Sequence, residues 1–151
     1  MARKTVTVKI DRPDSRDHGK EFLITELPST KGEKWAARAL NALLASGVDI
    51  PDNIARMGLR GVAMAAQTGR FKMDLSSFNG IPWEMAEPLL DEMMLCVQII
   101  PDPDRPAVIR PLIESDVEEI GTLLKLRMEW LGLHLGFSFA AKIPTSDSAA
   151  E

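Results

Sequence analysis

Side chains able to do chemistry are thinly spread along this chain of 151 residues. Three acidic groups have a spacing at which one carboxylate can serve as acid and another as base. They are Asp102 with Asp104, Asp116 with Glu118 and Glu119, and Glu87 with Asp91. Solvated helix starts and loop charges account for these groups better than catalysis does.

Motifs for metals, phosphates and nucleophiles are absent from the sequence. His18 and His134 are far apart and Cys96 is the only cysteine, so zinc-binding spacings do not occur. The patterns GxxxxGK[ST], GxGxxG after a strand and GxSxG are also missing. Cys96 lies in the apolar run MMLCVQII, where a buried small hydrophobic residue is the expected role. We expect no enzyme, no cofactor and no metal.

Composition predicts one ordinary soluble domain. Hydrophobic residues make up 45%, and the charged residues, 26%, are spread along the chain with a net charge of −4. This balance disfavours nucleic-acid binding, and no run reaches the roughly 18 apolar residues of a membrane span. We expect a cytoplasmic protein with a single domain over residues 1–140 and a disordered polar tail over 141–151.

Two segments near the N-terminus have the character of strands. Thr5–Ile10 alternates polar and apolar residues, Glu21–Leu27 is a second candidate, and the turn-rich stretch between them predicts an antiparallel hairpin. Residues 96–100 and 107–110 flank the stiff turn PDPDRP. They either pair as a second short hairpin or run extended.

Apolar spacing predicts four helices, lying between Thr30 and Gly47, over 54–67, over 83–97 and over 115–139. Thr30 and Glu33 match a capping box for the first helix. Gly58 and Gly61 weaken the second. In the third, Pro88 marks either the beginning of the helix or a kink. The expected fold is α+β and mostly α-helical: an N-terminal β-hairpin packed on a bundle of about four helices, with room for a second short hairpin.

The last helix has more apolar surface than one neighbour can cover. Ser115 and Glu118 predict its capped start. One predicted face consists of Val117, Ile120, Leu123, Leu124, Met128 and Leu131, and further apolar residues extend around the cylinder at Leu126, Trp130, Leu133 and Phe137. Methionines suit surfaces that accept varied apolar partners. We therefore expect a protein-binding surface made by Met93, Met94, Trp130, Leu133 and Phe137.

The stretch LLDEMMLCVQIIPDPDRPAVIRPLIESDVEEIGTLLKLRMEWLGLHLGF, residues 89–137, resembles the tail assembly chaperones of long-tailed, siphovirus-type bacteriophages and prophages. The segment GKEFLITELPSTKGEKWAARALNALLASGVDIP is similar to the same family. The resemblance implies a non-enzymatic assembly factor that binds the tape measure protein, keeps its apolar helices soluble and helps to recruit the tail tube protein. It also implies a place in the host cytoplasm and absence from the mature virion. The expected mode of recognition is a client helix in an apolar groove, and a homo-oligomer is left open.

Two alternative functions have tests of their own. A structural tail or head-completion subunit would remain in the virion, where mass spectrometry would detect it. A small DNA-binding regulator would use the helix over 54–67, but the acidic balance of the chain argues against it.

Overall fold

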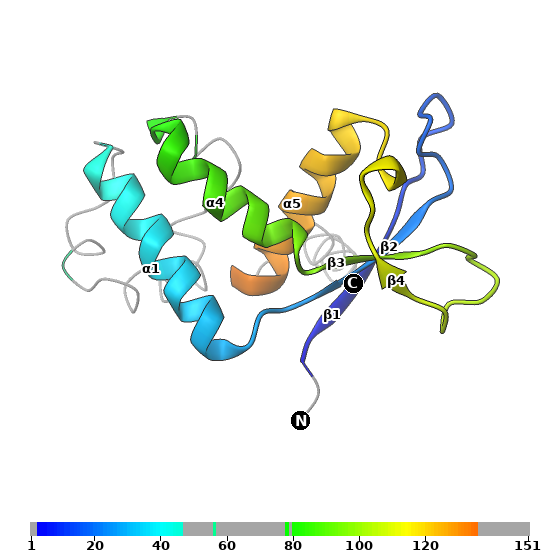
Figure 1. The fold of residues 1–151 in the computed structure, drawn as a ribbon, viewed down its shortest axis with the longest axis horizontal. Helices are drawn as coiled ribbons and strands as arrows, with labels where there is room; N and C mark the ends of the chain where they lie inside the picture. The colour runs from blue at the N-terminus through cyan, green and yellow to red at the C-terminus, as the bar shows by residue number, and fades with distance from the viewer. Residues whose placement is uncertain (1–2, 47–55, 57–77, 79, 136–151) are drawn as a thin grey trace, which may run out of the picture.

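A computed structural model of the chain describes residues 3–46, 56, 78 and 80–135. This part contains one four-stranded antiparallel sheet and three α-helices, an α+β architecture (Figure 1). The elements are β1 (Thr5–Lys9), β2 (Glu21–Thr25), α1 (Ser29–Ala45), α4 (Trp83–Met94), β3 (Val97–Ile100), β4 (Arg110–Pro111), the 3-10 helix η2 (Glu114–Asp116) and α5 (Ile120–Leu135). The predicted helix over 54–67, the stop at Gly47 and the predicted tail over 141–151 lie outside the described residues.

The sheet confirms the predicted N-terminal hairpin and joins it to a second one. Its strand order is β1-β2-β3-β4, so that residues 97–100 pair with both β2 and the short β4. Val8 lies opposite Phe22, and Phe22 lies opposite Ile99. Alternation along each strand turns these apolar residues to one face, where they are buried, while Thr5, Thr7 and Lys9 point to the other. Of the two possibilities for the PDPDRP flanks, the hairpin is the one observed.

The loop between β1 and β2 closes on a glycine. Gly19 has a φ of 83°, a left-handed conformation that glycine adopts without steric cost. Its N–H donates to the Ile10 carbonyl at 2.8 Å, and the Ile10 N–H donates to the Lys20 carbonyl at 2.9 Å. These two bonds continue the ladder beyond β1 and hold the loop of residues 11–18 in place.

Helix α1 begins at Ser29, and the predicted capping box of Thr30 with Glu33 is wrong. Pro28 is the N-cap residue, and no side chain caps the helix. The Pro28 carbonyl already accepts a bond from the Gly32 N–H at 2.9 Å. Thr30 is therefore inside the first turn, too late to act as the cap.

Helix α4 begins at Trp83 and carries Pro88 in its interior. Pro82 takes the N-cap position, and its carbonyl accepts bonds from the N–H groups of Met85 and Ala86. The helix ends at Met94, three residues before the predicted end, because Val97 belongs to β3. A helix beginning near Pro88 is excluded by this start.

Helix α5 begins at Ile120, so the predicted capping box of Ser115 with Glu118 is wrong. A single 3-10 turn over Glu114–Asp116 comes first, followed by extended backbone at Val117. Asp116 stabilises that turn, because its carboxylate accepts two bonds from the Arg110 guanidinium at 2.7 Å and one from the Ile113 N–H at 2.8 Å. The chain therefore turns before the helix begins.

The start of α5 is capped by Asp17, which lies in the loop between β1 and β2. Its carboxylate accepts bonds from the N–H groups of Glu118 and Glu119, at 3.0 Å each, and from the Thr122 hydroxyl at 2.6 Å. The Lys20 ammonium forms an ion pair with it at 2.8 Å. Burial raises the pKa of Asp17, whose exposed fraction is 0%, but these bonds together outweigh burial and lower the pKa to about 2.

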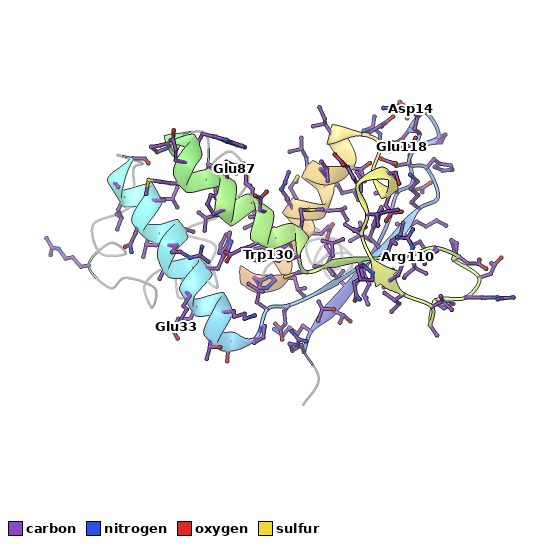
Figure 2. All side chains as sticks on the ribbon, viewed as in Figure 1. Asp14, Glu33, Glu87, Arg110, Glu118 and Trp130 are labelled. Carbon is purple, nitrogen blue, oxygen red and sulfur yellow. The ribbon has the colours of Figure 1, made fainter. Side chains whose placement is uncertain are left out.

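An aromatic group fills the core between the helices and the sheet. Trp35 of α1 lies 4.6 Å from Trp130 of α5 and 6.3 Å from Phe78, measured between ring centroids. The indole N–H of Trp35 donates to the Leu89 carbonyl at 3.0 Å, which links α1 to α4. Figure 2 places Trp130 in the middle of the molecule.

Candidate protein-binding surface

The residues predicted to bind a partner lie mostly inside the molecule. Met93 and Trp130 belong to the core, with exposed fractions of 0% and 1%. Met94 and Leu133 are half-buried and pack against that core. Phe137 lies outside the described residues. The structure therefore does not place Met93 or Trp130 where a partner can reach them in this conformation.

Helix α5 is rotated relative to the predicted arrangement of its faces. Leu126 and Trp130, predicted as surplus surface, are buried, whereas Ile120 and Leu124, predicted as one packed face, are 77% and 44% exposed. The rotation places the large indole of Trp130 against Trp35, where it buries more apolar area than a leucine would. Ile120 and Leu124 remain as an exposed apolar pair one turn apart.

His134 ties the end of α5 to the chain that follows β2. Its Nε2 accepts a bond from the Leu27 N–H at 2.9 Å, so that the proton is on Nδ1, which donates to the Trp130 carbonyl at 2.9 Å. The ring also stacks on the Trp130 indole, with centroids 3.8 Å apart. Burial lowers the pKa of His134. The neutral ring is the form that fits this site, because Nε2 must accept a proton.

Cys96 is half-buried at the junction of α4 and β3. Burial raises the pKa of its thiol, and the neighbouring Trp130 indole lowers that pKa by less. A raised pKa disfavours the reactive thiolate. The role of a small, partly buried apolar residue fits this environment.

A groove of about 850 Å³ lies beside Cys96, between the first half of α1, the end of α4 and the beginning of β3. Residues 25–28, at the end of β2 and just beyond it, line it as well. Leu95 is part of the lining and is 82% exposed. A volume of this size is within the range of protein sites that bind small ligands or a few side chains.

Charged side chains surround this groove. Arg3, Lys31, Lys34 and Arg38 supply cations, and Glu26 and Glu92 supply carboxylates. Arg38 of α1 and Glu92 of α4 form an ion pair across it. The Glu26 carboxylate accepts a bond from the Lys4 N–H at 2.8 Å.

Large apolar side chains are also exposed elsewhere on the described part of the chain. They are Leu44, Trp83, Met85, Val108, Ile109, Ile113, Ile120 and Leu124. Monomeric soluble proteins rarely gather such side chains into a large continuous patch unless the patch binds something. Leu95 is the most exposed residue of this kind and lies in the groove.

Of the acidic groups considered for catalysis, the one over residues 116–119 has structural partners. Asp116 pairs with Arg110, Glu118 pairs with Lys20, and Glu119 accepts bonds from Ser15 and from the Arg16 N–H. Within the described ranges, no group of three or more histidine, cysteine, aspartate or glutamate side chains is placed to bind a metal ion. No helix in these ranges has the length and apolar character needed to cross a membrane.

Searches for relatives found nothing: no protein-family model, no curated protein and no solved structure matches this chain. Support for the candidate surface therefore comes from the geometry of this structure and not from relatives.

Sequence reasoning did not find Leu95 or the groove cations. One signal was present, because Lys31, Lys34 and Arg38 recur at three- and four-residue spacing and so share one side of α1. The position of Leu95 had no such signal. It follows from the end of α4 at Met94, which leaves the next side chain outside both the helix and the strand.

Proposed function

We propose that this protein is a non-enzymatic tail assembly chaperone of a long-tailed bacteriophage or prophage. In this role it binds the tape measure protein, keeps the apolar helices of that client soluble and assists assembly of the tail tube. The proposal depends on the resemblance of residues 89–137 to that family. Leu95, exposed in the groove, is the structural observation that supports it best.

The groove is suited to one side of a helix. An amphipathic helix places apolar side chains at three- and four-residue spacing, and grooves that bind such helices combine apolar contacts with a charged rim. Here the apolar contacts come from Leu95 and its neighbour Leu27, and the rim is charged on both sides. Such a site holds a client by burying its apolar side chains without requiring chemistry.

Co-expression with the tape measure protein tests this function. We expect the client to remain in the soluble fraction and to co-purify with the chain, because its apolar helices are covered. Leu95→Ser should reduce the amount of client recovered, and Leu124→Ser, on α5 and outside the groove, is the matched control. A client that stays insoluble and unbound beside the natural protein would refute the proposal. Detection of the chain in purified virions would instead support a structural subunit.

A further inference from the structure

The cations of the groove form a stripe along α1. Lys31, Lys34 and Arg38 lie three and four residues apart, so that their side chains project from one side of the helix over roughly 10 Å. Arg38 is paired with Glu92. Lys31 and Lys34 form no ion pair with any residue in the described part of the chain. These two ammonium groups are therefore available to a ligand.

The charge of the groove is opposite in sign to that of the whole molecule. Its lining holds four cations and two carboxylates, an excess of two positive charges, whereas the chain has a net charge of −4. Among the described residues, the Arg3 guanidinium donates to the Glu26 backbone carbonyl, at 3.4 Å, and forms no ion pair. Such a local field attracts an acidic ligand and repels a basic one.

Apolar surface lies directly beside these cations. Leu27 and Pro28 precede α1, and Leu95 lies at the junction of α4 and β3. A ligand that matches both features needs an apolar side and carboxylates next to it. Free phosphate or a purely acidic peptide would leave the leucine surface exposed to water, and a purely apolar helix would leave the lysines without partners.

We propose that the groove binds an acidic amphipathic α-helix of a client protein, with leucine-like side chains on Leu95 and carboxylates on Lys31 and Lys34. The inference builds on the proposed function and specifies which segments of the client are held. On a helix, carboxylates three residues apart repeat the spacing of the two lysines. Client segments with basic polar faces are excluded from the groove by the same charges.

A synthetic helical peptide with one leucine face and glutamate pairs three residues apart is the probe. Its affinity for the full-length protein is measured by fluorescence anisotropy at increasing salt. We expect binding that weakens with salt, because exposed charges are screened over about 8 Å at physiological ionic strength. The double variant Lys31→Glu/Lys34→Glu should weaken binding by about tenfold or more, since two attractions become repulsions. Leu95→Ser should weaken it by about tenfold as well.

Charge exchange provides the strictest test. A peptide with lysine in place of each glutamate should bind the Lys31→Glu/Lys34→Glu variant better than it binds the natural protein. Lys125→Glu and Leu124→Ser change the same residue types on α5, away from the groove, and should leave affinity within about twofold. Circular dichroism confirms that each variant is folded.

Three results would overturn the inference. The glutamate peptide could bind the Lys31→Glu/Lys34→Glu variant as tightly as the natural protein, or the lysine peptide could bind the variant no better than the natural protein. The third result is a dimer of the natural chain that the double substitution abolishes. The last result would mean that a second copy occupies the groove. If the reversed variant still holds the tape measure protein, the groove is not the client site, although the proposed function stands. A further outcome is that the peptides show the expected charge preference while the natural protein fails to bind the tape measure protein. In that case the proposed function fails, and the preference of the groove for acidic helices stands.

Discussion

The two ends of α5 are both tied to the N-terminal hairpin, but by different chemistry. At its start, the ionised carboxylate of Asp17 accepts bonds from two backbone N–H groups, a hydroxyl and an ammonium. At its end, the neutral ring of His134 accepts one bond from the Leu27 N–H. Figure 2 labels Asp14 in the hairpin loop and Glu118 just before the start of α5. The contact at the start of α5 requires the charged form of Asp17, and the contact at its end requires the neutral form of His134.

The two ends of α5 also differ in whether the charged side chains around them have partners. Around Asp17 the charged groups bind one another, among them Lys20, Glu118 and Glu119. Near His134 the groove begins, and there Lys31 and Lys34 have no partner among the described residues. Charges hold the fold together at one end and are left for a ligand at the other.

Removing the carboxylate of Asp17 should have the largest effect. Asp17→Ala leaves the N–H groups of Glu118 and Glu119 without their acceptor and removes one of the two ion-pair partners of Lys20, which should lower the free energy of unfolding by about 3 kcal/mol. Urea unfolding followed by circular dichroism measures this change. Asp14→Ala, in the same loop but exposed, is the control and should change stability by less than about 0.5 kcal/mol. A similar loss in both variants would mean that Asp17 does not cap α5.

Acid should weaken the start of α5 only at very low pH. The pKa of Asp17 is lowered from 3.8 to about 2, so the stability that it contributes is complete above pH 3.8 and is lost as the pH falls from 3.8 to about 2. The loss should be up to about 2 kcal/mol. Urea titrations across this range measure it, and Asp17→Asn should remove this component of the pH dependence. An unchanged profile in Asp17→Asn would refute the role of the charge.

The end of α5 should respond to milder acid. Burial lowers the pKa of His134 below 6.5, so its contribution to stability is complete above pH 6.5 and declines as the pH falls below that value. Protonation of Nε2 removes the acceptor for the Leu27 N–H, a loss of about 1 kcal/mol. Nuclear magnetic resonance of the imidazole measures the pKa. His134→Gln keeps an acceptor without titrating and should remove this component of the profile below pH 6.5.

Reversal of the groove charges should have the smallest effect on stability. Lys31→Glu/Lys34→Glu should change the free energy of unfolding by less than about 0.5 kcal/mol, because both side chains are exposed and a glutamate near the start of α1 suits the helix dipole. Urea unfolding of the double variant measures it. A loss of several kcal/mol would show that the lysines serve the fold instead of a ligand.

Local patterns predicted the fold class and the first hairpin. Alternation over Val6, Val8 and Ile10 reports directly on which side of a strand is buried. The start of α5 was mispredicted because its cap comes from Asp17, about 100 residues earlier, and no short motif records such a partner. Its faces were mispredicted because the helix is apolar all round, so the pattern alone does not say which side meets the sheet.

The groove was not predicted for a related reason. It forms where the end of β2 and the start of α1 meet the junction after α4, which lies dozens of residues further along the chain. The sequence shows the stripe of Lys31, Lys34 and Arg38 but not the apolar wall that faces it. A binding surface assembled from several elements becomes visible only when the elements have been placed.

The bond between Asp17 and Thr122 can form only after both residues have been synthesised. The two residues are 105 positions apart, and a chain grows at roughly 5–20 residues per second. After Asp17 has been made, roughly 5–20 seconds pass before Thr122 exists. The hairpin loop must wait that long for the Thr122 hydroxyl, so the contact between the loop and α5 can form only after α1 and α4 have been synthesised.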